Sequence, residues 1–206
     1  MHTVLAHPLV KHRVTLMRDV NTKPKQFREL VNEITEFLAI EALKDLRTVE
    51  VPVTTPVAKT TGVKIADSIV IVPILRAGMG MLDAMLRILP YAKVGVIGMQ
   101  RDEATAEPVP YYAKIPRAKS DELAIVIDPM LATGGSACDA FVQLKKLDYR
   151  RILFLSLIAA PEGIAKVERE HPDVQLFTAA KDERLNRHFY IVPGLGDAGD
   201  RVFGTL

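Results

Sequence analysis

Short apolar runs alternate with segments of helical spacing through most of the chain after residue 68. The apolar runs read SIVIVPIL, KVGVIGM, LAIVID, RILFLSLIAA and VQLFTAA, and the helical segments between them read MGMLDAMLRIL, ACDAFVQLKKL and PEGIAKVEREH. Strands that are apolar on both faces and separated by helices indicate a parallel sheet with helices on both sides. We therefore expect an α/β fold with a mostly parallel central sheet.

Other segments depart from this alternation. Apolar residues recur every three or four positions from Pro24 to Leu46, which predicts an amphipathic helix. The stretch TVEVPVTTPVAKTTGVKI alternates and carries two prolines, so it predicts irregular or edge strands. A long polar connection, expected to be a flexible loop at about residues 100–120, and a Gly-rich tail at about residues 190–206 complete the chain. Long connections in compact domains are usually functional or disordered.

Composition narrows the class of protein. A length of 206 residues, with 49 % hydrophobic and 25 % charged residues, favours one globular domain over residues 1–206. No apolar run approaches the ~20 residues of a membrane helix, and the N-terminus lacks the pattern of a signal peptide, so we expect a cytoplasmic protein without a membrane partner. The single cysteine, Cys138, fits a reducing compartment and a packing role. A formal charge of +2 does not by itself indicate nucleic-acid binding.

The most informative motif is IVIDPMLATGGSACDA, residues 125–140. Asp128 follows an apolar run, and a turn with two glycines leads into the next helix. In open parallel sheets ligands bind at this edge, where glycines admit an anion and the helix N-terminus offers free N–H groups. The motif is neither a Walker loop nor a dinucleotide turn. We interpret it as a phosphate-binding loop, with an ordinary capped turn as the alternative.

VIDPMLATGGSA resembles the fingerprint with which type I phosphoribosyltransferases bind phosphoribosyl diphosphate (PRPP), in the form carried by the uracil branch of that family. The common form has two adjacent acidic residues, and here Pro129 fills the second place. The resemblance extends from KHRVTLMRDVNTKPKQFRELVNEI through VPILRAGMGM and MQRDEATAEPVPYY to YIVPGLGDAGDRVFGT. It implies the type I phosphoribosyltransferase fold, with a small hood formed by the C-terminal and N-terminal segments.

The resemblance also implies a set of PRPP-binding residues. Asp128 alone would hold the ribose hydroxyls, and the backbone and hydroxyls of the loop would hold the 5′-phosphate. The loop residues assigned to PRPP are Pro129, Met130, Leu131, Ala132, Thr133, Gly134, Gly135 and Ser136.

Two arginines are the expected contacts of the diphosphate. Arg76 follows a predicted strand, and its planar guanidinium suits a bidentate grip on diphosphate oxygens; a cap at the sheet edge is the alternative. The family pattern adds a cis peptide bond beside it. Arg101 opens the long connection and would reach the same group when that loop closes and excludes water. Taken alone, Arg101 is more often a surface charge, but its match to the family motif MQRDE favours the diphosphate contact.

The Gly-rich tail corresponds to the base pocket of the uracil enzymes. Main-chain groups of Ile191, Gly196 and Ala198 would match the donors and acceptors of uracil, while Asp197 would contact both PRPP and the base. Cytosine would leave buried polar groups unpaired. The catalytic set implied is therefore Arg76, Arg101, Asp128 and Asp197.

The expected reaction is uracil plus PRPP giving UMP and diphosphate. The resemblance implies Mg²⁺ brought with PRPP, with no metal ligand assignable, a homo-oligomer (dimer or tetramer) and, in some members, activation by GTP. Lys145, Lys146, Arg150 and Arg151 are expected to be a solvated helix end, with an effector site as the alternative. Met79, Met81 and Met85 are expected to pack in the core. Two alternatives remain: an RNA-binding pyrimidine operon regulator on the same fold, and a purine enzyme. We expect no nucleic-acid partner.

Overall fold

A computed structural model describes residues 2–101 and 108–205 of the chain. Its helices are α1 (Pro8–Arg18), α2 (Pro24–Ala42), α3 (Met79–Ile88), α4 (Gly135–Lys146), α5 (Pro161–Glu170) and α6 (Ala198–Phe203). Its longer strands are β2 (Thr48–Thr54), β3 (Lys59–Ile65), β4 (Ile69–Leu75), β6 (Val96–Arg101), β7 (Pro108–Lys114), β8 (Leu123–Ile127), β10 (Arg151–Ala159) and β11 (Gln175–Lys181). The short strands are β1 (His2–Val4), β5 (Lys93–Val94), β9 (Met130–Leu131), β12 (Arg184–Leu185) and β13 (Ile191–Val192).

The central sheet confirms the predicted α/β class. Its strands run in the order β1-β11-β10-β8-β4-β6-β7, with β5 paired to β4 and β9 paired to β10. These pairs are parallel except for β6 and β7, which are antiparallel. The middle strands β8 and β10 are buried along almost their whole length. This explains why their sequences are apolar at consecutive positions.

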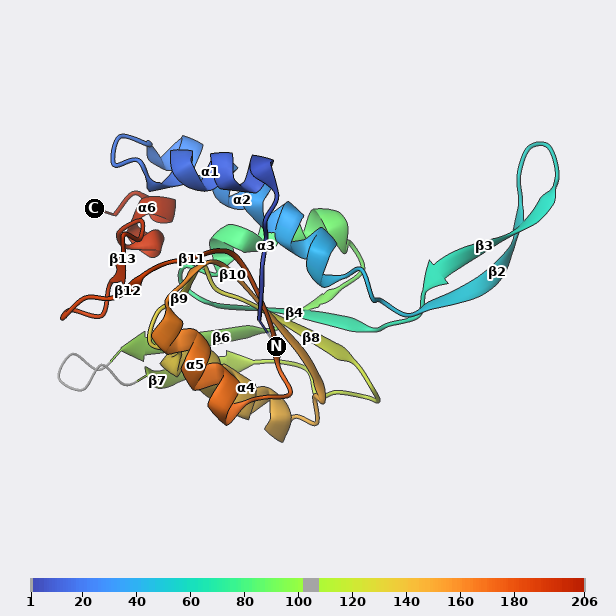
Figure 1. Cartoon of the computed structure of the whole chain (residues 1–206). Helices are drawn as coiled ribbons and strands as arrows, with labels where there is room; N and C mark the ends of the chain where they lie inside the picture. The colour runs from blue at the N-terminus through green and yellow to red at the C-terminus, as the bar shows by residue number, and fades with distance from the viewer. Residues whose placement is uncertain (1, 102–107, 206) are drawn as a thin grey trace.

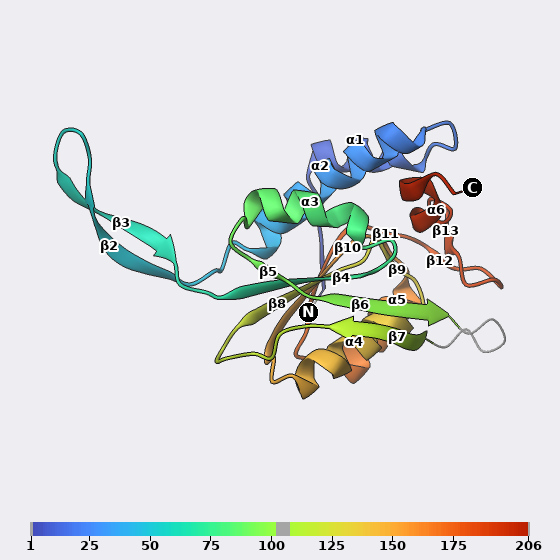
Figure 2. The ribbon, with the colours of Figure 1, turned by 180° about the vertical axis from the view of Figure 1, so that it is seen from behind.

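Helices cover both faces of the sheet, as Figures 1 and 2 show. Helices α1, α2 and α3 lie on one face, and α4 and α5 lie on the other. Each face has its own core: Phe27, Ile34 and Met85 are fully buried on the first, while Phe141 and Phe154 pack edge to face on the second. Helix α6, near the C-terminus, lies beside α1 and α2 (Figure 1) and forms the hood with them.

Several boundaries differ from the sequence-based expectations. Helix α2 ends at Ala42 rather than at Leu46, and α1 was not predicted. The expected long connection is shorter, because β7 pairs with β6 as an antiparallel edge strand; residues 102–107 lie outside the described residues. The Gly-rich tail contains the short helix α6. Met81 and Met85 are fully buried as predicted, but Met79 is 38 % exposed, so its core assignment was wrong.

Among the described strands, β2 and β3 pair only with each other, and they form a two-stranded arm that extends away from the body (Figure 1). The expectation of strands outside the centre of the sheet is confirmed here. At the base of the arm, Ala66 N–H donates to the Arg47 carbonyl at 2.9 Å. One buried carboxylate, Asp67, fixes this base to the body.

The Asp67 side chain is fully buried and binds two arginines. Arg47 donates to it from its backbone N–H at 2.9 Å and from Nε at 2.7 Å, and Arg151 of β10 donates from Nη1. Burial alone would raise the pKa of Asp67, but the hydrogen bonds from Arg151 and Arg47 lower it from 3.8 to about 2. The ionised carboxylate therefore stabilises the folded chain.

We expect Asp67→Asn to destabilise the chain most at neutral pH. Because the pKa is lower in the folded state, the ionised carboxylate contributes about 2 kcal/mol above pH ~4, and this is lost as pH falls toward ~2. Urea unfolding at several pH values should show the gap between wild type and variant shrinking on acidification. Asp148→Asn is the control, since Asp148 and Arg117 form an exposed pair worth ~0–1 kcal/mol. A gap independent of pH would contradict this account.

Candidate active site

The phosphate-loop candidate lies where the sequence placed it, between β8 and α4. Asp128 follows Ile127, the last residue of β8, and its Oδ1 accepts from Met130 N–H at 3.4 Å. The N–H of Gly135, the first residue of α4, points to Thr133 Oγ1 at 3.4 Å. Asp128, Met130 and residues 131–137 line one cavity. A helix N-terminus, backbone N–H groups and hydroxyls thus face a common space suited to an anion.

Glycine is required in this loop for two reasons. Gly134 has φ +81°, a left-handed conformation that side chains rarely adopt. A Cβ at Gly134 would also lie 3.0 Å from the carbonyl oxygen of Gly163 in α5. Helix α5 therefore packs directly behind the loop, which leaves the opposite side of the loop for a ligand.

The second loop connects β4 to α3 and carries Arg76. The Leu75–Arg76 peptide bond is cis, which confirms the expectation drawn from the family pattern. At Gly78 a Cβ would lie 2.5 Å from the carbonyl oxygen of Ile127 and 2.6 Å from that of Ile74. The backbone of this loop consequently touches the end of β8, one residue before Asp128. Two anion-binding candidates are thereby held side by side at the carboxyl edge of the sheet.

The glycine-rich tail forms the third loop. It follows β13 and includes Gly194 at φ +65° and Gly196 at φ +79°. A Cβ at Gly194 would lie 2.1 Å from the carbonyl oxygen of Ile191, so no larger residue fits. Asp197 caps α6 by accepting from Asp200 N–H at 2.9 Å. A Cβ at Gly199 would lie 3.7 Å from the Ala77 Cβ, so the tail contacts the Arg76 loop.

Arg76 connects the tail and the β4 loop. Its side chain is 61 % exposed, its Nη2 lies 3.3 Å from Asp200 Oδ1, and its guanidinium carbon lies 5.8 Å from the centre of the Phe203 ring. Asp200 also accepts from the Thr205 hydroxyl at 2.7 Å. Sequence reasoning missed Asp200; its position three residues after Asp197 in the motif GDAGD was the available signal.

The structure brings the predicted residues together at one edge of the sheet; only the side chain of Arg101 lies outside the described residues. Arg76, Asp128 and residues 129–136 come from loops that touch, and Ile191, Gly196, Asp197 and Ala198 lie in the tail beside them. Arg101 is the last residue of β6, which runs parallel to β4. Its backbone is therefore at the same edge.

Two arginines hold the tail in place, and sequence reasoning identified neither. Arg18, at the end of α1, pairs with the buried Asp182 and donates to the Gly194 carbonyl at 2.7 Å. Asp182 in turn accepts from Gly194 N–H at 2.9 Å. Both polar backbone groups of Gly194 are thus fixed by one ion pair.

Arg201 is the second anchor, and it is buried inside the hood. It donates to the carbonyls of Leu195, Met17 and Asp19 at 2.6–2.9 Å, and its guanidinium lies 4.4 Å from the Phe27 ring centre. Burial lowers the pKa of Arg201. The three carbonyls accept from its N–H groups in place of water. Movement of the tail would break these hydrogen bonds and leave a buried guanidinium unpaired.

Cys138 is buried, which agrees with the packing role predicted for it. It lies in the first turns of α4. Burial raises the pKa of its thiol to about 11, which leaves it protonated and unsuited to act as a nucleophile.

Comparisons with known proteins agree on one family. The family model described as "Uracil phosphoribosyltransferase" matches residues 4–205. Curated relatives named uracil phosphoribosyltransferase include one from Exiguobacterium sibiricum, 54 % identical over 98 % of this chain and 97 % of its own, and one from Campylobacter curvus, 52 % identical over 98 % of both chains.

Solved structures support the same fold. The AQ2163 protein from Aquifex aeolicus has a TM-score of 0.94 and 39 % identity over 98 % of both chains. An adenine phosphoribosyltransferase from Trypanosoma brucei, solved with AMP, pyrophosphate and ribose-5-phosphate, has a TM-score of 0.60 at 12 % identity over 87 % of this chain and 83 % of its own. The latter likeness is one of fold alone.

We expect Asp200→Asn to increase the affinity for inorganic diphosphate measured by calorimetry with Mg²⁺. Its carboxylate competes with an anion for Arg76, and an exposed ion pair of ~0–1 kcal/mol predicts a gain of up to about fivefold. Arg76→Ala should lose diphosphate affinity instead. Thr205→Val is the matched control, because it removes a partner of Asp200 without changing its charge. Unchanged or weaker binding in Asp200→Asn would contradict competition at Arg76.

Proposed function

The chain belongs to the uracil phosphoribosyltransferase family, and we propose that it transfers the phosphoribosyl group of PRPP to uracil, giving UMP and diphosphate. The observation that carries this proposal is the meeting of the Arg76 loop, the residue 128–136 loop and the glycine-rich tail at one edge of the parallel sheet. PRPP needs two anion sites and a ribose contact, and the base needs a third site nearby. Three adjacent loops of these kinds match the parts of the two substrates.

In this proposal the residue 128–136 loop holds the phosphorylated ribose. Backbone N–H groups and hydroxyls from Ala132 to Ser136 would bind the 5′-phosphate at the N-terminus of α4. Asp128 would accept from the ribose hydroxyls, with Pro129, Met130 and Leu131 shaping the turn. Arg76 is supported as the diphosphate contact by its exposed guanidinium beside this loop. Arg101 remains a proposed second contact because β6 ends at the same edge.

The tail is proposed to read uracil through its main chain. Ile191, Gly196 and Ala198 supply backbone groups, and the glycine at Gly196 permits a close approach to the ring edge. The anchors Arg18 and Arg201 keep this backbone in a fixed conformation before the base arrives. Cytosine would place an amino group against a donor, at a cost of ~1–3 kcal/mol for each unpaired buried group. Rigid main-chain readers would therefore discriminate between the two pyrimidines.

Catalysis would depend on positioning and electrostatics. As the bond from C1 of the ribose to diphosphate breaks, Arg76 and Arg101 would stabilise the charge on the leaving group, and Asp128 and Asp197 would hold the ribose for attack by uracil N1. The carboxylate of Asp197, at the start of α6 beside the Arg76 loop, is an oxygen donor of the type that Mg²⁺ prefers. When bound with PRPP, Mg²⁺ supplies charge neutralisation on the diphosphate.

The two alternatives have weaker support. An RNA-binding regulator would need a basic face, whereas the formal charge is only +2 and relatives of 50 % identity and more are named as the enzyme. A purine enzyme would share the fold, but the family that matches residues 4–205 is the uracil one. We retain both only as outcomes of the activity test.

Regulation and location are further parts of the proposal. GTP is proposed as an activator by family resemblance. Two of the four basic residues suggested for an effector site already form ion pairs, Lys145 with Asp173 at 2.7 Å and Arg151 with Asp67. The GTP proposal is therefore supported by the family resemblance and not by these residues. Among the described residues, no helix combines the length and apolarity of a membrane crossing. The cytoplasmic location and the single domain over residues 1–206 stay predictions.

We also propose that the chain forms a homo-oligomer through the β2–β3 arm. A two-stranded ribbon is marginal in water without further cover. This arm exposes the apolar side chains of Val49, Val57, Val63 and Ile65, and Val57 is 94 % exposed at its tip. A second copy of the chain would cover these residues and hold the arm.

The activity test is the conversion of labelled uracil with PRPP and Mg²⁺, with cytosine and hypoxanthine as competing bases and with or without GTP. We expect UMP from uracil alone and a loss of at least about tenfold in kcat/KM in Asp128→Ala, because a charged hydrogen-bond acceptor for the ribose is removed. Asp139→Ala, at a half-buried position of α4 outside the residues that line the cavity, is the control. No product from uracil under any condition would refute the assignment and make salt-dependent RNA binding the next measurement.

The arm proposal predicts a change in mass. Val63→Lys places a charge on the arm, where it can pair with Glu50 on the neighbouring strand without disturbing the ribbon. We expect sedimentation equilibrium to show an oligomer for the wild type and a shift toward monomer for this variant, because burying the new charge disfavours association. Ile40→Lys, at an exposed apolar position of α2, should leave the mass unchanged. A monomeric wild type would refute the proposal.

A further inference from the structure

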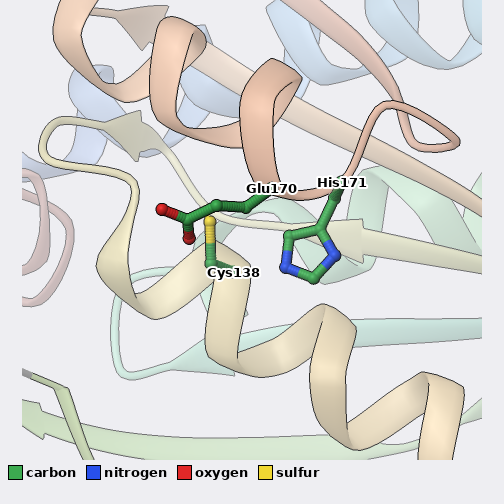
Figure 3. Close-up of side chains that lie close together, drawn as sticks. All are labelled: Cys138, Glu170 and His171. Carbon is green, nitrogen blue, oxygen red and sulfur yellow. The ribbon is translucent and has the colours of Figure 1, made fainter.

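A cluster of three metal-ligating side chains lies between α4 and the C-terminal end of α5. Cys138, Glu170 and His171 each offer a ligand atom, and these atoms lie within 4.8 Å of one another. Figure 3 shows the thiol of Cys138 between the Glu170 carboxylate and the His171 ring. We propose that Cys138, Glu170 and His171 bind a thiophilic divalent cation of the Zn²⁺ class.

The donor set and the spacing suit such a cation. Zn²⁺ prefers thiolate sulfur, imidazole nitrogen and carboxylate oxygen at about 2.0–2.3 Å, so ligand atoms around one ion lie roughly 3–4 Å apart. A separation of up to 4.8 Å needs only small rotations of the side chains. Three protein ligands leave a fourth position for water. The site therefore resembles an open rather than a closed coordination sphere.

The three ligands come from rigid elements. Cys138 N–H donates to the Gly134 carbonyl at 2.9 Å in the first turns of α4. Glu170 is the last residue of α5, and His171 caps that helix through an N–H bond to the Val167 carbonyl at 2.7 Å. The His171 ring packs edge-on against Phe141, with centroids 5.4 Å apart. Cys138 and His171 are buried while Glu170 is exposed, so an ion has a path in from solvent.

Nearby charged side chains already contact two of the three proposed ligands. Lys145 Nζ lies 3.0 Å from His171 Nδ1 and 2.7 Å from Asp173 Oδ1, so Nε2, the nitrogen on the Cys138 side in Figure 3, is the proposed ligand. Arg169 binds the Glu170 carboxylate at 2.7 Å. Metal binding at Nε2 requires the imidazole proton to be on Nδ1, so Lys145 must give up its contact with His171 and keep the one with Asp173. The Glu170 carboxylate must also leave Arg169. These rearrangements predict moderate affinity.

Metal binding must also displace the thiol proton. Burial and the Glu170 carboxylate raise the pKa of Cys138 to about 11, so the free thiol is protonated. Coordination converts it to the thiolate and releases one proton to solvent. The ion would join the end of α5 to the start of α4, the helix that presents the phosphate loop.

The experiment is a titration of the full chain with Co²⁺, followed by competition with Zn²⁺. Cys138 is the only cysteine in the sequence, so a sulfur-to-cobalt charge-transfer band in the near ultraviolet reports on this residue alone. We expect a band that saturates at one Co²⁺ per chain, disappears when Zn²⁺ is added, and is absent in Cys138→Ala. Zn²⁺ should also raise the melting temperature of the wild type but not of this variant.

The remaining variants separate a three-ligand site from a lone thiol. Glu170→Gln and His171→Gln should each weaken Co²⁺ binding by at least about tenfold, as loss of a ligand does at least as much as loss of a supporting group. His12→Gln, an exposed histidine of α1, should leave the titration unchanged. Far-ultraviolet circular dichroism confirms that each variant folds, and any one folded ligand variant suffices for the comparison. Absence of the band in the wild type, or full affinity in every one of these ligand variants that folds, would overturn the proposal.

Discussion

The arrangement of the candidate site depends on the contact between the Arg76 loop and the end of β8 at Gly78. A Cβ there would overlap three backbone atoms within 2.7 Å, so only glycine lets the chain turn at this point. The contact brings the backbone beside Arg76 next to Ile127, the residue before Asp128, although Arg76 and Asp128 follow different strands. Parallel neighbouring strands place their following loops at the same edge of a sheet. The close approach at Gly78 goes further and brings two of these loops into contact, so that they can form one site. The glycine-rich tail then contacts the Arg76 loop through Gly199 and Ala77.

The tail has a different physical basis, since charged side chains rather than backbone packing hold it. Arg18 and Asp182 fix Gly194, and Arg201 donates to three carbonyls, one in the tail and two at the end of α1. Burying a guanidinium is unfavourable unless its donors are paired, so the tail has few alternative conformations that satisfy Arg201. A main-chain binding surface without large side chains needs such supports from outside. In this chain α1 and α2 provide them, which gives the hood a role in shaping the site.

The sequence predicted the parts that depend on local pattern. The strands β4, β8 and β10 are apolar at consecutive positions because both faces are covered, and Asp128 was identified because a polar residue and glycines follow such a strand. Helix α1 was missed although Val10, Val14 and Met17 repeat at helical spacing, because the segment is short and otherwise polar. Strand β7 was missed because an antiparallel edge strand does not need an apolar sequence. The roles of Asp200 and Arg201 arise from contacts more than 120 residues apart, such as Arg201 with Met17, and no local pattern encodes them.

The arm has a consequence for how such chains can change over evolution. Strands β2 and β3 pair residue for residue from Thr48 with Ile65 to Thr54 with Lys59, and neither pairs with the central sheet. Insertion or deletion of one residue on each strand would lengthen or shorten the ribbon while Arg47 and Asp67 stay opposite each other at its base. The register of the central sheet and the loops at its far edge would not shift. The length of the arm can thus change independently of selection on the loops that form the candidate site.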